Sequence, residues 1–255
     1  MTFCDKLIVI KIRNDCMPRF FVNEKPETSC VITGEDAVHI GRSLRMKTGE
    51  EITVCHDGVD YSGVVERITD SEVFVKVIKS APSSSEPDVF LTLFQAMPKG
   101  DKVEMIIQKA VELGASRVVL VMTDRCVSRP DEKSFSKKLS RYQKISESAA
   151  KQSGRGIIPE ISGIINVKQA VKELSECDIS LICYEKGGIS LNDAGLEKGK
   201  SVGVFIGSEG GFEEKEVQMC VNNGVKVIGL GNRILRCETA PLAAISIIMN
   251  ITGNM

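Results

Sequence analysis

Two glycine-rich segments in the last quarter of the chain have the residue types and spacing of a ligand-binding site. The first, Val202–Phe212, reads VGVFIGSEGGF, an apolar run that enters three glycines and a carboxylate. The second, Val225–Pro241, reads VKVIGLGNRILRCETAP and also passes from an apolar run into glycines. Each pattern predicts a strand, a glycine loop and a helix, and such loops let a ligand approach the main chain. A tight turn without a ligand is the alternative interpretation of the first segment.

The second loop also carries two cations around an apolar pair. Arg233 and Arg236 flank Ile234 and Leu235. An apolar pair between guanidinium groups suits a flat base that is held beside an anionic chain. The alternative is a solvated loop with two surface arginines, in which Thr239–Pro241 only begin the last helix.

The composition limits the class of function. The 255 residues carry a formal net charge of -1, so any nucleic-acid surface must be local. Nine cysteines without a C-x-x-C pair, together with only His39 and His56, show no zinc-ligand spacing and give a histidine-dependent hydrolase few candidates. An odd number of cysteines favours free thiols in a reducing cytoplasm. No stretch approaches the roughly 20 apolar residues of a membrane span. We therefore expect a cytoplasmic protein with no metal and no membrane partner.

Residues 17–79 have the pattern of a small β domain. Short alternating runs are separated by turn signals, and only Glu35–Leu44 predicts a short helix. Many short strands with turns favour a small barrel. We expect residues 1–16 to be an N-terminal extension or the result of an upstream start, and the Ser/Pro-rich residues 80–88 to be a linker. The expected strands are Phe20–Val22, Ser29–Ile32, Glu51–Cys55, Tyr61–Ile68 and Glu72–Ile78.

Residues 89–255 alternate between strand and helix patterns, which predicts an α/β fold with a mainly parallel sheet. The last helix is apolar on nearly all faces, so it must be buried from several sides, and we expect a second subunit of a homodimer to cover part of it. The expected strands are Val89–Phe94, Val118–Met122, Ile179–Tyr184, Val202–Ile206 and Val225–Leu230, and the expected helices are Lys102–Leu113, Ser134–Ala150, Val167–Leu174, Glu213–Asn222 and Thr239–Asn250.

One internal segment is strongly basic. Residues 125–155 contain nine Lys/Arg against three acids, a local charge of +6 in a chain of -1. A charged helix face is commonly only a solvated face. Beside a ligand pocket, however, this sign of charge is what phosphate contacts require. The residues predicted to contact the phosphates of a nucleic acid are Arg19, Arg42, Arg45, Lys99, Arg125, Arg129 and Arg155.

Two other ligand-binding folds are disfavoured. A dinucleotide-binding fold expects G-x-G-x-x-G after the first strand, but Phe94–Gly100 contains a single glycine. The stretch Ala194–Ser201 is similar to a phosphate loop, yet it precedes a strand, whereas a phosphate loop follows one.

The two glycine segments resemble a known family. Ile206–Phe212 resembles the I-G-P-E-G-G-F signature of the ribosomal RNA small subunit methyltransferase E family, and Leu230–Ala240 matches its L-G-x-R-I-L-R-x-E-T-A at every fixed position. One departure is Ser208, where the family usually has proline. Further similarity covers the chain from about residue 17 to the end, through Met17–Phe21, His39–Arg45, Lys102–Gly114 and Ala150–Arg155.

The resemblance implies a SPOUT-type parallel sheet over residues 89–255 with a C-terminal trefoil knot, a rare exception to unknotted chains. It also implies a PUA-like RNA-binding barrel over residues 17–79, and a homodimer. S-adenosylmethionine is expected in a pocket made by the knot loops. The residues expected to bind it are Tyr184, Ile206, Gly207, Glu209, Gly210, Gly211, Leu230, Gly231, Ile234, Leu235, Thr239 and Ala240.

The expected reaction is methylation of N3 of a uridine in 16S ribosomal RNA of the small subunit. Uridine N3 is a poor nucleophile until its proton is lost, and the resulting charge spreads onto the flanking carbonyl oxygens. Arg236 is the catalytic candidate because a guanidinium aimed at those oxygens lowers the barrier. Glu209 or Glu238 is expected to accept the proton or to orient Arg236. The alternative is a non-catalytic RNA-binding or ribosome-assembly protein on the same fold.

Overall fold

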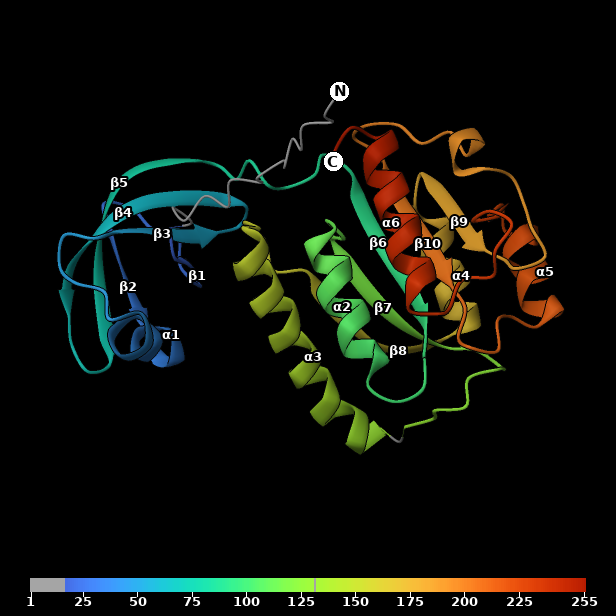
Figure 1. Cartoon of the computed structure of the whole chain (residues 1–255), viewed down its shortest axis with the longest axis horizontal. Coiled ribbons are helices and arrows are strands. Elements are labelled where there is room, and N and C mark those ends of the chain that lie inside the picture. The colour runs from blue at the N-terminus through green and yellow to red at the C-terminus, as the bar shows by residue number, and fades with distance from the viewer. Residues whose placement is uncertain (1–16, 131) are drawn as a thin grey trace, which may run out of the picture. The chain divides into compact units, whose positions relative to one another are not determined.

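The protein is described by a computed structural model that covers residues 17–130 and 132–255, without the side chains of residues 132–134. The predicted N-terminal extension, residues 1–16, and the side chain of Lys133 in the basic segment lie outside the described residues. The described chain forms two compact units, which divide between Pro82 and Ser83 (Figure 1).

The first unit is a five-stranded sheet around its own core. All neighbouring strands are antiparallel except β1 and β3, which are parallel. Alternate residues of the central strands face the core, so side chains such as Val54, Val65 and Val75 are buried. The predicted helix is present as α1 (Gly34–Val38) followed by a π-helix (His39–Leu44). The strands are β1 (Arg19–Phe21), β2 (Ser29–Thr33), β3 (Glu51–His56), β4 (Val59–Ile68) and β5 (Glu72–Pro82), in the order β1-β3-β4-β5-β2.

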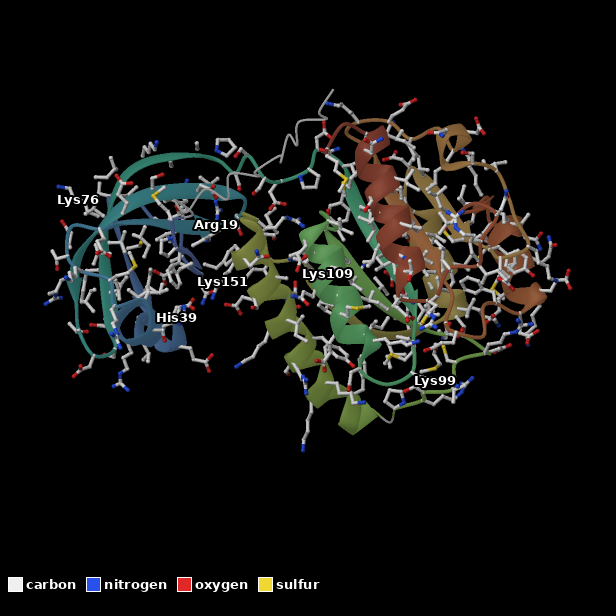
Figure 2. The ribbon with its side chains drawn as sticks, in the orientation of Figure 1. Arg19, His39, Lys76, Lys99, Lys109 and Lys151 are labelled. Atoms are coloured by element: carbon white, nitrogen blue, oxygen red, sulfur yellow. The ribbon has the colours of Figure 1, made fainter. Side chains whose placement is uncertain are left out.

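Arg19 of β1 is part of this sheet (Figure 2). Its guanidinium donates to the Asp60 carboxylate of β4 at 2.6 and 2.8 Å and to Cys55 Sγ of β3 at 3.0 Å. Burial by itself lowers the pKa of Arg19, but the hydrogen bond and the charge of Asp60 outweigh burial and raise it. An internal ion pair thus already engages the guanidinium of Arg19, and its contact with phosphate stays a prediction.

The segment predicted as a linker is ordered at both ends. Ser80–Pro82 continue β5 and pair with β4, so the strand extends beyond its predicted end at Ile78. Glu86 belongs to the second unit, where its carboxylate accepts hydrogen bonds from Arg155 at 2.9 and 2.8 Å and from the backbone N–H of Gly156 at 2.8 Å. The boundary between the units thus falls inside the predicted linker. The residues before it belong to the first unit and those after it to the second.

The second unit is a six-stranded sheet in which all neighbouring strands are parallel. Helix α2 packs against both α3 and α6, and Figure 1 shows these three helices in front of the sheet. The strands are β6 (Phe90–Ala96), β7 (Arg117–Met122), β8 (Glu160–Asn166), β9 (Ile179–Cys183), β10 (Ser201–Ile206) and β11 (Lys226–Ile228), in the order β11-β9-β10-β6-β7-β8. The helices are α2 (Lys102–Glu112), α3 (Glu132–Ser153), α4 (Val167–Ser175), α5 (Glu214–Asn222) and α6 (Thr239–Ile251).

The order of the strands brings three loops together. The chain runs from β6 outward through β7 to β8, and then crosses to β9, β10 and β11 on the other side of β6. In parallel sheets, ligands bind outside the carboxyl ends of the strands where this order reverses.

Within residues 17–130 and 132–255, no helix is both long and apolar enough to cross a membrane, and no cluster of His, Cys, Asp or Glu side chains could hold a metal ion.

Candidate active site

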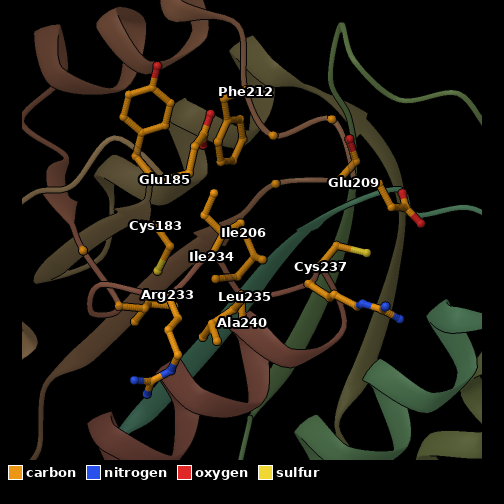
Figure 3. A pocket seen from close by; sticks show the side chains of 18 of the residues that line it. Cys183, Glu185, Ile206, Glu209, Phe212, Arg233, Ile234, Leu235, Cys237 and Ala240 are labelled. Atoms are coloured by element: carbon orange, nitrogen blue, oxygen red, sulfur yellow. The ribbon is translucent and has the colours of Figure 1, made fainter.

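A pocket of about 470 Å³ lies at the carboxyl ends of β9, β10 and β11 (Figure 3). Its walls are Ile206–Phe212 after β10, Gly229–Cys237 after β11, and several residues from Cys183 to Gly187 after β9. Lys102 of α2 and Ala240 of α6 complete it. All of the residues predicted to bind the cofactor line this pocket except Thr239, which begins α6 and is exposed.

The glycines of the first loop are required by its close packing. An ideal Cβ on Gly207 would lie 3.1 Å from the Cα of Gly211, so a side chain there would push the two limbs of the loop apart. Gly211 has a φ of +68°, and its Cβ position is 3.1 Å from the Glu185 carboxylate oxygens. The loop therefore folds tightly, and Gly211 lies against the carboxylate of Glu185, which belongs to the pocket wall after β9.

One lysine joins two loops of the pocket. Lys102 Nζ lies 3.0 Å from the Glu209 carboxylate, which follows β10, and 3.0 Å from the Glu238 carboxylate, which precedes α6. Glu209 also accepts a hydrogen bond from the backbone N–H of Lys99 at 3.1 Å. Cys237 lies in the same cluster, 3.8 Å from Lys102 Nζ. The sequence analysis did not identify Lys102 as a site residue. The signal that could have done so is its position at the start of α2, which follows the carboxyl end of β6.

The charges of this cluster are stabilised by their partners. The hydrogen bonds to Glu209 and Glu238 raise the pKa of Lys102 well above its ordinary value. Burial raises the pKa of Glu209, but the hydrogen bonds from Lys102 and the backbone outweigh burial and leave it lowered. The hydrogen bond from the Cys237 thiol, followed by that from Lys102, lowers the pKa of Glu238. Burial raises the pKa of Cys237 to about 12. At neutral pH the cluster therefore holds one ammonium, two carboxylates and a neutral thiol.

Arg236 is one of the residues that line the pocket. Among the described residues, no side-chain hydrogen bond or ion pair engages Arg236 or Arg233. Both Glu209 and Glu238 are engaged by Lys102 in this structure, and the role of either carboxylate in orienting Arg236 stays a prediction. Ile234 is 85% exposed between the two arginines, which leaves an apolar side chain beside two unpaired cations at the pocket.

Ser208 places a buried hydroxyl at the pocket. The residue is 6% exposed and lines the pocket, and within the described part of the chain its Oγ has no hydrogen-bond partner. Its carbonyl accepts a bond from the Gly211 N–H at 2.9 Å, which closes the turn of the loop. Leaving a buried hydroxyl unpaired costs about 1–3 kcal/mol, so a ligand that pairs with it recovers that cost.

Arg125 holds the same loop from outside the pocket. Its guanidinium donates to the Gly210 carbonyl at 2.9 Å and to the Glu213 carboxylate at 2.8 Å. The hydrogen bond to Glu213 raises the pKa of Arg125. Arg125 is thus bound to the loop after β10, and its contact with RNA stays a prediction.

Comparisons with known proteins show the family of this chain. A family model described as an RNA methyltransferase domain matches residues 85–249, and a model described as an RNA methyltransferase PUA domain matches residues 32–78. The Bacillus subtilis ribosomal RNA small subunit methyltransferase E is 35% identical over 247 residues, covering 91% of this chain and 96% of the relative. This chain belongs to the ribosomal RNA small subunit methyltransferase E family.

Further relatives in this methyltransferase family cover about nine tenths of the chain. The Mesomycoplasma hyopneumoniae enzyme is 32% identical and covers 89% of this chain and 96% of its own length. A crystal structure of the Neisseria gonorrhoeae enzyme bound to S-adenosyl methionine has a TM-score of 0.84 at 29% identity, covering 92% of this chain and 98% of that chain. The expected parallel α/β sheet and PUA domain of the family are thereby confirmed.

The remaining residues predicted to contact RNA divide into two groups. Arg42, Arg45, Lys99 and Arg129 are exposed. Arg155 is 3% exposed, and besides Glu86 it donates to the carbonyls of two residues near the end of α2. The predicted RNA contact by Arg155 is therefore wrong, because a buried guanidinium cannot reach a phosphate on the surface.

Proposed function

We propose that this chain transfers a methyl group from S-adenosylmethionine to N3 of a uridine in 16S ribosomal RNA of the small subunit. The observation that supports this most strongly is the pocket of glycine loops after β9, β10 and β11 in a member of this family. The Neisseria gonorrhoeae relative is described as bound to S-adenosyl methionine. A ribosomal substrate also agrees with a cytoplasmic location.

The residues of the pocket fit the chemistry of this cofactor. A volume of about 470 Å³ is within the range of roughly 300–1,000 Å³ that small-molecule sites occupy. Leu230, Leu235 and Ala240 offer apolar surface to a flat heterocycle, and the Glu185 carboxylate offers a partner to a cationic group. The orphaned Ser208 hydroxyl offers a further hydrogen bond. When bound, S-adenosylmethionine supplies an electrophilic methyl group, so the protein has to position and activate the acceptor.

Arg236 is proposed to activate the uridine. Loss of the N3 proton spreads negative charge onto the neighbouring carbonyl oxygens, and a free guanidinium at the pocket stabilises that charge. Glu209 is the proposed proton acceptor, since it lines the pocket whereas Glu238 does not. Its lowered pKa makes Glu209 a weak base, so stabilisation of the anion by Arg236 carries most of the activation.

The kinetics of Arg236→Ala test this assignment. If Arg236 stabilises charge that develops only in the transition state, its removal lowers kcat. If Arg236 only contacts a phosphate of the RNA, its removal raises the RNA concentration needed and leaves kcat unchanged. We expect slow methyl transfer at saturating RNA. Recovery of full turnover at high RNA would instead make Arg236 an RNA contact.

The RNA is proposed to lie on two basic surfaces. One comprises Arg42 and Arg45 of the first unit. The other comprises Lys99 and Arg129 of the second unit, which contains the pocket. These side chains are exposed, as phosphate contacts require. The target base must also leave its stack to reach the pocket.

Two finer features of the fold are part of the proposal. A trefoil knot is supported by the segment after β9, which returns to β11: Ile189 donates to the Val227 carbonyl at 3.0 Å and accepts from Gly229 at 3.1 Å. An ideal Cβ on Gly188 would lie 2.3 Å from the Val227 carbonyl oxygen, so the segment after β9 packs tightly against β11 there. Closure of the small unit into a PUA-like barrel is supported by the single core that its strands and Ile40 share.

A homodimer is also proposed. Helix α6 is apolar, yet Ile247 is 39% exposed on it. An apolar helix with an uncovered side chain suits a subunit interface. Light scattering is expected to show a dimer at micromolar concentration, and a monomer would reject this part of the proposal.

Mass spectrometry of ribosomal nucleosides tests the proposed function. Small-subunit RNA from cells with the gene should contain a 3-methyluridine that cells without the gene lack. The alternative, a non-catalytic RNA-binding protein on this fold, predicts identical nucleosides and no affinity of the purified protein for S-adenosylmethionine.

A further inference from the structure

We infer that Lys102 is a positioning residue that latches the loop after β10 to the loop after β11 and thereby holds the cofactor pocket in its binding shape. Lys102 begins α2, at the end of the segment that follows β6. Its ammonium contacts Glu209 from one loop and Glu238 from the other, each at 3.0 Å. The inference rests on the proposed function, because the ligand whose binding is coupled to the latch is S-adenosylmethionine.

The arrangement differs from an ordinary surface ion pair. Exposed pairs contribute little because water replaces either partner. Here one cation serves two carboxylates, and the side chains of Glu209 and Glu238 are only 28% and 16% exposed. Within the described residues, no other cation forms a salt bridge with either carboxylate. Lys102 is therefore the group that allows the two loops to approach each other.

Removal of the ammonium leaves two like charges facing each other. Both carboxylate oxygens lie 3.0 Å from the same nitrogen, so they are within about twice that distance of each other. Carboxylates that share a site repel unless one is protonated or a cation lies between them. Without Lys102 the loops should separate, and the pocket walls Ile206–Phe212 and Gly229–Cys237 should separate with them.

The direct test is the affinity of Lys102→Met for S-adenosylmethionine, measured by calorimetry at pH 7.5. We expect it to fall by roughly tenfold to a hundredfold, because the repulsion of two unit charges up to about 6 Å apart near a protein surface corresponds to about a hundredfold before the loops separate. Lys102→Arg keeps the charge and should remain close to the wild type. Thermal melting of each variant shows that it is folded.

A second substitution separates charge from shape. Lys102→Met with Glu238→Gln has the same cluster charge as the wild type, because one carboxylate is removed along with the ammonium. Glu238 does not line the pocket. The double variant should therefore recover most of the lost affinity. A role of the lysine stem in packing alone predicts no recovery.

The pH profile gives a readout that a packing role would not change. The charged and titratable groups facing the latch are Lys102, Glu209, Glu238 and the neutral thiol of Cys237. In Lys102→Met, acidification from pH 7.5 to 5.5 should begin to protonate one of the unpaired carboxylates. The ratio of wild-type to variant affinity should then shrink toward acid pH.

The outcomes distinguish this inference from the proposed function. A wild-type protein that binds no S-adenosylmethionine overturns both. A wild type that binds, together with a Lys102→Met variant of equal affinity or a double variant that fails to recover, overturns the latch alone.

Discussion

The ion pair between Arg155 and Glu86 distinguishes a structural role of Arg155 from the RNA contact that its place in the basic segment predicted. Arg155 is 3% exposed, and its guanidinium donates twice to Glu86 and to the carbonyls of Val111 and Ala115. Arg155→Ala removes one partner of a buried pair, which costs about 3–5 kcal/mol of the free energy of unfolding. For a unit of this size each kcal/mol shifts Tm by roughly 2–4 °C, so Tm should fall by about 6–20 °C.

The matched control is Arg141→Ala. Arg141 pairs with Glu104 at 2.7 Å but is 68% exposed, so its loss should cost about 0–1 kcal/mol. Calorimetric melting of both variants measures the difference. The RNA affinity of folded Arg155→Ala should equal that of the wild type. A variant that melts like Arg141→Ala but binds RNA more weakly would refute the reasoning and restore Arg155 as an RNA contact.

Three further predictions concern the site. Without ligand, Ser208→Ala should be at least as stable as the wild type, because it removes an unpaired buried hydroxyl. It should bind S-adenosylmethionine roughly 2–10-fold more weakly by calorimetry. Unchanged affinity would mean that the hydroxyl does not face the ligand. Gly207→Val should abolish calorimetric cofactor binding because its Cβ meets Gly211, whereas Gly163→Val, whose Cβ makes only an ordinary contact, should not; equal binding by both would place the ligand elsewhere. Arg42→Glu with Arg45→Glu should weaken RNA binding and reduce its salt dependence while leaving cofactor affinity intact; an unchanged salt slope would remove these arginines from the RNA surface.

The repeating patterns of the second unit predicted most of its elements from sequence. The apolar spacing of Lys102–Leu113 matches α2, and the glycine segments match the loops after β10 and β11. Strand β8 was missed because it is an edge strand with intermediate burial and a glycine at 163, so it lacks both an apolar run and clear alternation. Local pattern identifies an element only where one face is consistently buried.

Long-range partners could not be predicted from the sequence. Lys102 and Glu209 are 107 residues apart, and Arg155 and Glu86 are 69 residues apart. A basic segment shows how much charge is present but not which cations an acid elsewhere in the chain neutralises. That is why Arg19, Arg125 and Arg155 had the pattern of RNA contacts, although the fold engages each of them internally.

The most direct test of the central claim is transfer by the purified protein. Small-subunit particles from cells without the gene would be incubated with the protein and S-adenosylmethionine that carries a deuterated methyl group, and the RNA would be digested for mass spectrometry. We predict labelled 3-methyluridine as the single labelled nucleoside, dependent on Arg236. A label on another atom or base, or no label from a protein that binds S-adenosylmethionine, would contradict the proposed reaction.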